Sequence, residues 1–102
     1  MTTVEVSVVA EASERASRTI IDREMPSVLE SVSYARDVVV CSVPAAFRRN
    51  VSPVVVELVA NAVKHGSGPV GLRVDLDGDR LLIAVSDAGS AVCAEVEASL
   101  RS

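Results

Sequence analysis

The chain has 102 residues, 49% of them hydrophobic, and a formal net charge of -4 at pH 7. This length supports one small domain with a single core and is too short for two. The acidic balance argues against direct nucleic-acid binding, because such proteins gather Lys and Arg on one face. The longest apolar runs cover only a few residues, well short of the ~20 that cross a bilayer, so we expect no membrane segment and a cytoplasmic location.

The first 24 residues give two expectations. Residues 3–9 alternate, with Val4, Val6 and Val8 on one side, which predicts a half-buried strand. Residues 11–24 are mostly charged and polar, and their pattern fits either a frayed helix or a connection. We leave these two alternatives open.

A first amphipathic helix is predicted from Met25 to near Pro44. Its apolar residues recur at three- and four-residue steps, and Ser27 and Glu30 are spaced as a capping box. Residues 44–50 are then predicted to form a short connection.

A second helix is predicted over residues 53–65. Ser52 would cap its N-terminus, and Pro53 would be its first helical residue, where a missing N–H is tolerated. Gly66 can take the left-handed conformation that closes a helix.

Residues 70–76 and 80–86 alternate and are predicted to form an antiparallel hairpin. If Asp77-Gly78 is a two-residue turn, Leu76 pairs with Asp79, and Val70 lies opposite Val85. Six apolar side chains then share one face: Val70, Leu72, Val74, Leu81, Ile83 and Val85.

The segment after Gly89 is short and allows a small helix with Val92 and Val96 on one side. The hairpin would then keep an exposed edge, and Leu82 and Ala84 would face away from the helices. An uncovered edge beside outward apolar side chains favours self-association, so we expect a homodimer.

A polar stripe runs along the second helix. Glu57, Asn61, Lys64 and His65 lie at positions i, i+4, i+7 and i+8, apart from the apolar face. Asn is a poor residue for the middle of a helix, so Asn61 calls for a partner other than water. Asp87 has the parity of the inward-facing side chains of its strand, which predicts a carboxylate at the edge of the core.

These two regions resemble a known family. Residues 57–66, ELVANAVKHG, resemble the N box of the GHKL ATPase superfamily, and residues 81–89, LLIAVSDAG, resemble its first glycine box. The likeness covers residues 25–90 and is closest to the bacterial anti-sigma-factor serine kinases and their stand-alone ATP-binding relatives. It implies an α+β fold of one histidine-kinase-like ATPase domain over residues 1–102. That fold is a two-layer, Bergerat-like α/β sandwich with helices on one face of a mainly antiparallel sheet.

The resemblance also implies roles for individual residues. Asn61 would offer its side-chain oxygen to Mg²⁺ on the nucleotide phosphates, and Glu57 would act as general base or orient the attacking group. Lys64 would lie nearer the phosphates as a screening cation. Asp87 would accept a hydrogen bond from the adenine amino group, and Gly89 would let the backbone pass close to the base. His65 is expected to cap the C-terminal end of the helix, where a positive charge interacts favourably with the helix dipole.

The sequence departs from the family after Gly89, where the second glycine-rich segment and its lid are expected and no further glycine occurs. Three functions stay open: an ATP-dependent serine kinase and anti-sigma factor, a non-catalytic interaction module that binds a sigma factor or an antagonist protein, and an oligomer without a ligand. The resemblance favours a regulatory protein that binds ATP and Mg²⁺. We expect weak ATP binding, and slow or absent phosphoryl transfer, because much of the phosphate cradle is missing.

Overall fold

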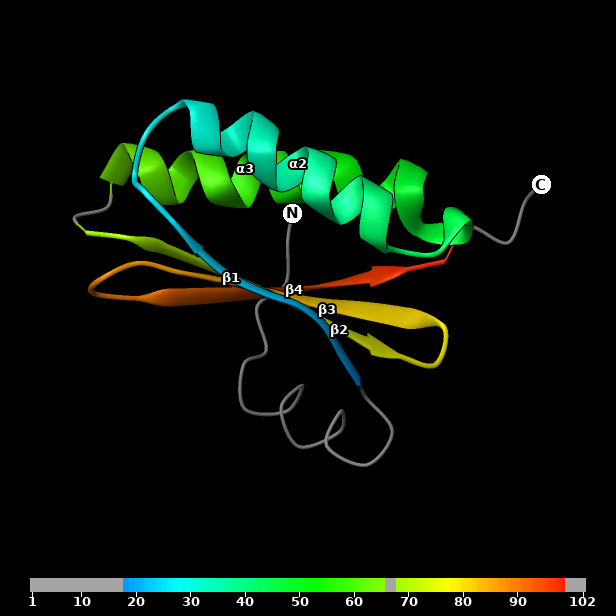
Figure 1. The fold of residues 1–102 in the computed structure, drawn as a ribbon. Helices are drawn as coiled ribbons and strands as arrows, with labels where there is room; N and C mark the ends of the chain where they lie inside the picture. The colour runs from blue at the N-terminus through cyan, green and yellow to red at the C-terminus, as the bar shows by residue number, and fades with distance from the viewer. Residues whose placement is uncertain (1–17, 66–67, 99–102) are drawn as a thin grey trace.

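The computed structural model describes residues 18–65 and 68–98. The elements in chain order are β1 (Arg18–Met25), α2 (Glu30–Ser42), α3 (Ala45–His65), β2 (Val70–Asp77), β3 (Arg80–Ser86) and β4 (Ala91–Glu97). The strands form one sheet in the order β1-β2-β3-β4, with every neighbouring pair antiparallel. Both helices lie on the same face of this sheet (Figure 1), which confirms the predicted two-layer α+β sandwich. Neither α2 nor α3 is long and apolar enough to cross a membrane.

The core lies between the inner face of the sheet and the two helices. All six apolar side chains predicted on one face of the hairpin are buried. Val51, Val55 and Val59 meet them from α3, and their four-residue spacing keeps them on one side of that helix. Burial of this apolar surface is the main favourable term in forming the two layers.

The predicted hairpin is confirmed, but its register is wrong by two residues. Leu72 lies opposite Val85, whereas Val70 pairs with Met25 of β1. The two turn residues are Gly78 and Asp79, and of these only Gly78 has a positive φ, of 64°. This φ pattern belongs to a type II′ turn, with glycine at its first central position. Because strand side chains alternate with period two, the shift leaves every residue on its predicted face.

Two strands were missed by the sequence analysis. Residues 18–25 form β1, neither a helix nor a connection, and residues 91–97 form β4 where a short helix was suggested. The expected strand over residues 3–9 falls outside the described residues. With β1 on β2 and β4 on β3, the hairpin lies at the centre of the sheet.

This arrangement removes the two features from which self-association was predicted, an uncovered hairpin edge and outward-facing apolar side chains. Both edges of the hairpin are covered, and the outward-facing Leu82 is buried, with 7% of its surface exposed. Ala84 is half-buried. The homodimer stays a prediction, but the hairpin edge and Leu82 no longer argue for it.

The first helix begins later than predicted. Met25 ends β1, and α2 starts at Glu30 with Leu29 at its N-cap and no side-chain cap. The predicted capping box is therefore wrong. The Ser27 hydroxyl instead points to the carbonyl of Val63 on α3, at 3.5 Å.

The second helix begins earlier than predicted. α3 runs from Ala45, so residues 45–50 are helical, and Pro53 lies inside the helix, not at its start. Phe47 is 3% exposed and joins the core. Burying an aromatic side chain stabilises by about 1.5–3 kcal/mol. That gain offsets much of the ~3 kcal/mol that a proline costs in a helix interior.

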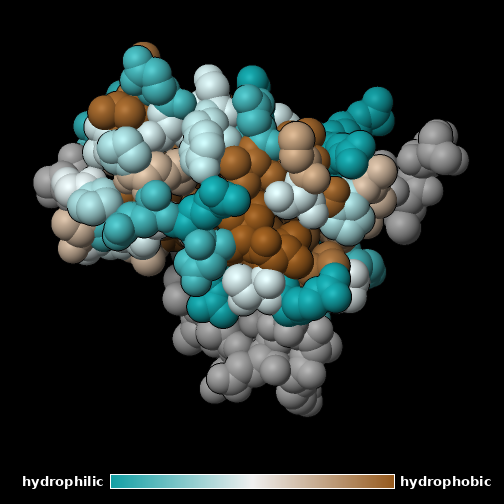
Figure 2. All heavy atoms as spheres, in the orientation of Figure 1, coloured by the Kyte–Doolittle hydropathy of each residue, from teal (hydrophilic) through white to brown (hydrophobic). Residues whose placement is uncertain are grey.

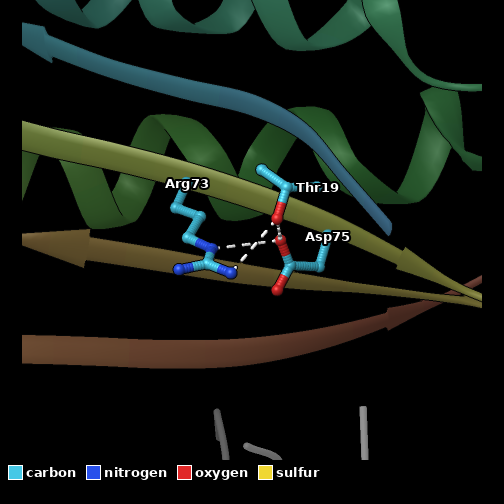
Figure 3. Close-up of polar contacts among 3 residues, drawn as sticks. All are labelled: Thr19, Arg73 and Asp75. Atoms are coloured by element: carbon cyan, nitrogen blue, oxygen red, sulfur yellow. Dashed lines mark hydrogen bonds and ion pairs between the residues drawn. The ribbon is translucent and has the colours of Figure 1, made fainter. Parts of the chain in front are cut away.

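The outer face of the sheet carries a polar cluster that ties β1 to β2. The Thr19 hydroxyl donates to Asp75 Oδ1 at 2.7 Å, and Arg73 donates from Nη2 to Thr19 Oγ1 at 3.1 Å (Figure 3). Arg73 Nε also pairs with Asp75 Oδ1 at 3.2 Å. Farther along this face, Arg80 pairs with Glu95 at 2.9 Å between β3 and β4.

Candidate functional site

The C-terminal half of α3 and the turn between β3 and β4 enclose an open pocket of about 180 Å³. Four apolar and four polar residues line it: Leu58, Ala62, Val85, Val92, Asn61, His65, Asp87 and Ser90. The pocket therefore has apolar walls with a few polar groups at their rim.

Helical periodicity explains how α3 contributes half of the pocket. Leu58, Asn61, Ala62 and His65 lie at i, i+3, i+4 and i+7, which places them on one face of the helix. Asn61 and His65 are exposed, while Leu58 and Ala62 are half-buried against the core. The mid-helix Asn61 thus lies beside a pocket, as its unfavourable helix propensity suggested.

The turn after β3 holds the carboxylate of Asp87 by one oxygen. Oδ1 accepts hydrogen bonds from the amide of Gly89 at 2.9 Å, from the amide of Ser90 at 3.0 Å and from the Ser90 hydroxyl at 3.3 Å. The Asp87 amide in turn donates to the Ser90 carbonyl at 2.9 Å. A carboxylate that bonds backbone two and three residues ahead fixes the shape of a turn.

These contacts favour the ionised form of the Asp87 carboxylate. The amide of Gly89 contributes most to holding the pKa of Asp87 below its ordinary value. Burial opposes this effect and is the second-largest contribution, while the amide and hydroxyl of Ser90 and the charge of His65 add smaller contributions that also lower the pKa. The pocket therefore presents a negative charge at neutral pH. His65, which lines the same pocket, interacts electrostatically with this carboxylate.

Two of the five residues assigned by resemblance meet at this pocket. Asn61 and Asp87 both line it, although they come from different motifs. Glu57 and Lys64 are exposed on α3 and do not line it. Gly89 is exposed, and it donates its amide to Asp87.

The position of Gly89 has no steric need for glycine. Its φ is not positive, and an added Cβ would meet nothing within 4 Å. The expected close approach of backbone to a base therefore concerns a bound ligand alone, and the protein's own packing does not require it.

Two polar residues of the pocket were not assigned to it from the sequence. Ser90 lies three residues after Asp87, a spacing that in turns puts a backbone amide on the aspartate side chain, and this spacing could have identified it. His65 was assigned to the helix end, but its i+4 spacing from Asn61 also placed it on the pocket side.

One pocket residue, Asn61, has a side-chain oxygen of the kind that magnesium binds. Within residues 18–65 and 68–98, no three His, Cys, Asp or Glu side chains gather into a metal-binding group. Asn61 offers one amide oxygen at the pocket. Mg²⁺ commonly takes only one or two protein oxygens and completes its shell with phosphates and water. Asn61 fits that role.

The size of the pocket limits what it can hold. Pockets for drug-sized ligands usually span about 300–1,000 Å³. A pocket of about 180 Å³ suits one flat ring system, with the remainder of a ligand outside it.

No protein-family model matches the chain, and neither a curated protein nor a solved structure is similar to it at a significant level.

Proposed function

We propose that the chain is a regulatory ATP-binding protein, resembling the anti-sigma-factor serine kinases, that binds ATP with Mg²⁺ and a sigma factor or antagonist protein in the cytoplasm. One observation carries this proposal. Asn61 from α3 and Asp87 from the end of β3, the central residues of the two motifs, line the same pocket.

The walls of the pocket suit the base of the nucleotide. Leu58, Ala62, Val85 and Val92 offer apolar surface to the faces of a ring. Asp87 offers an ionised acceptor to an exocyclic amino group. Apolar contact together with one charge-assisted hydrogen bond is the usual way in which a small pocket orients a ring.

The exposed side of α3 would serve the phosphates. Glu57, Asn61 and Lys64 are all exposed there and are spaced at about one turn from one another. In this proposal Asn61 holds Mg²⁺, Lys64 screens phosphate charge, and Glu57 orients or deprotonates an acceptor. The bound ion would supply neutralisation of charge between the phosphates.

A protein-interaction module without nucleotide is the second candidate. Leu29 is 75% exposed at the entrance to α2, and Val28 and Tyr34 near it are exposed as well. Figure 2 shows a further apolar area in the middle of one face, between α2 and the sheet, with polar side chains around it. Apolar surface grouped in this way favours a protein partner over a ring-sized ligand.

Calorimetric titration of the purified chain with ATP, with and without Mg²⁺, tests the first proposal. We expect binding weaker than about 10 μM, because part of the phosphate cradle is missing and each charge-assisted hydrogen bond stabilises by about 1.5–3 kcal/mol. Asp87→Asn should abolish binding, and Asn61→Ala should remove its dependence on Mg²⁺.

Asp22→Asn is the matched control, because Asp22 is exposed on the outer face of the sheet, away from the pocket. It should leave binding unchanged. No heat of binding at millimolar ATP would remove nucleotide binding and favour the interaction module. Equal losses in the Asp22 and Asp87 variants would contradict a specific role of Asp87 in binding the nucleotide.

A further inference from the structure

The Asp87 carboxylate uses its two oxygens differently. Three donors converge on Oδ1: the amides of Gly89 and Ser90 and the Ser90 hydroxyl. A carboxylate oxygen offers about two lone-pair sites, so Oδ1 has no acceptor capacity left for a ligand. Oδ2 is the oxygen with which a molecule in the pocket can pair.

Ser90 supplies two of the three donors, and it also lines the pocket itself. Its carbonyl accepts the Asp87 amide at 2.9 Å, so the two residues are joined in both directions. Rotation of the carboxylate would break both bonds from Ser90 to Oδ1. Together with the Gly89 amide, Ser90 therefore fixes the orientation of Asp87, the one carboxylate among the described residues that line the pocket.

We propose that Ser90 is a positioning and specificity-determining residue, which holds Asp87 by Oδ1 so that Oδ2 faces a ring that carries an exocyclic amino group. This inference rests on the proposed function and adds to it the reason why the site would select one ring from its close analogues. The Ser90 hydroxyl touches Asp87 and acts through it.

The chemistry of a fixed, ionised acceptor defines the ligand class. A ring amino group donates to Oδ2, whereas a ring carbonyl at the same place brings two acceptors together and is repelled. Adenosine carries an amino group at C6, where inosine carries a carbonyl and also has a proton on the adjacent N1. A well-placed hydrogen bond to a charged acceptor corresponds to about a tenfold to hundredfold preference for adenosine.

The experiment measures two properties of the full chain and its Ser90→Ala, Ser90→Thr and Ser33→Ala variants. One is the ratio of adenosine to inosine affinity, from NMR titration with each nucleoside. The other is the pKa of the Asp87 carboxyl, from its own carbon resonance without ligand. Ser33 is exposed on α2 and provides the matched serine control.

We expect Ser90→Ala to raise the pKa of Asp87, because one of the hydrogen bonds that favour its ionised form is lost. The adenosine preference should fall about threefold or more as the carboxylate gains freedom. Ser90→Thr keeps the hydroxyl and should restore both values, and Ser33→Ala should alter neither. His65, which also lines the pocket and lowers the pKa of Asp87, is present in all four proteins.

Unchanged pKa and unchanged preference in Ser90→Ala would overturn the inference, as would equal changes in Ser33→Ala. If the wild-type chain binds neither nucleoside, the base-selecting role inferred for Ser90 fails, whereas ATP calorimetry still tests the proposed function. The ligand-free titration then still decides whether Ser90 holds the carboxylate: a raised pKa supports this, and an unchanged one overturns it.

Discussion

The two ends of β3 are both turns that contain aspartate and glycine, yet they are built in different ways. At the start of β3, Gly78 takes a φ of 64° and reverses the chain in two residues. At its end, the turn from Asp87 to Ser90 needs no positive φ and is fixed by the Asp87 side chain. The first turn depends on backbone freedom and the second on a carboxylate.

The surroundings of the two turns differ as well. The Gly78 turn is joined to the end of β4, where the Ala98 amide donates to the Asp79 carbonyl at 3.1 Å. The Asp87 turn borders the pocket, beside α3. Both turns reverse the chain and contain aspartate and glycine. The turn at Asp87 also holds a charged side chain beside the pocket. The four predictions below test this division.

The largest loss of stability is expected between the two turns, where Ile83 is fully buried at the centre of the sheet. Ile83→Ala should lower the free energy of unfolding by about 2–5 kcal/mol, since it removes buried carbons and leaves a cavity. Urea unfolding measures it, and Ile83→Val, at about 0.5–1.5 kcal/mol, gives the graded control. A loss smaller than that of the Val variant would show that the turns contribute more to the free energy of unfolding than the packing of β3 does.

Gly78→Ala should come next, with a loss of about 1–2 kcal/mol, because an L-residue is strained at positive φ. An added Cβ meets nothing within 4 Å, so the cost is one of backbone conformation alone. Gly78→Asn should lose less, since Asn tolerates this region better. Equal losses in both variants, measured by urea unfolding, would point to packing in place of backbone strain.

Asp87→Asn should lower stability in a pH-dependent way. The pKa of Asp87 in the fold lies below the ordinary value of 3.8, so its ionised form stabilises the fold fully above that pH. This stabilisation is lost as the pH falls through the lower folded pKa. The difference between wild type and variant, from urea titrations, should therefore be largest near pH 7 and shrink below 3.8. The same profile in Asp22→Asn would contradict a specific role of the turn.

Gly89→Ala should have the smallest effect on stability, within about 0.5 kcal/mol, because the site is open and the φ is not positive. Its effect should fall on nucleotide binding, if the backbone there passes close to the base. Unfolding and ATP titration of the same variant separate the two properties. A stability loss as large as that of Gly78→Ala would make the two turns equivalent.

The sequence predicted the central hairpin well because pattern and turn agree there. Alternation over residues 70–76 and 80–86 is strict, and any register compatible with it buries the same side chains. The exact register could not be predicted, since Asp77-Gly78 and Gly78-Asp79 are both plausible turns. Pairing with β1 and β4, along with the turn, settles the register.

The edge strands escaped prediction for a different reason. In β1, Ile20 and Ile21 are adjacent, and an irregularity in pairing between Thr19 and Ile21 interrupts the alternation. In β4, Ala and Glu are common and favour helices locally. Pairing with an already formed neighbour decides both cases, and a local pattern does not contain that information.

Part of the candidate site could be derived from the sequence because its two motifs lie on the second helix and the hairpin, whose existence was predicted. Helical periodicity puts Asn61 on the side of α3 that borders the sheet, and strand alternation puts Asp87 on the side of the sheet that faces the helices. Packing the helix on the hairpin therefore brings both residues to one pocket. Ser90 and Val92 enter the pocket only because β4 turns back along β3, and that strand was not foreseen.

Pro53 interrupts the hydrogen bonding of the long helix α3, and this interruption affects how the helix opens locally. Proline has no amide to donate to the Arg49 carbonyl, so one rung of the helical ladder is absent. The segment before it is fastened to β4, where the Asn50 side chain donates to the Glu97 carbonyl at 3.1 Å. The segment after it carries Asn61 and His65. The missing bond lowers the cost of opening one segment without the other, and local openings of this kind set amide exchange over minutes to hours. A molecule bound in the pocket would therefore slow amide exchange in the segment from Pro53 to His65. Exchange of the amides before Pro53 would stay unchanged.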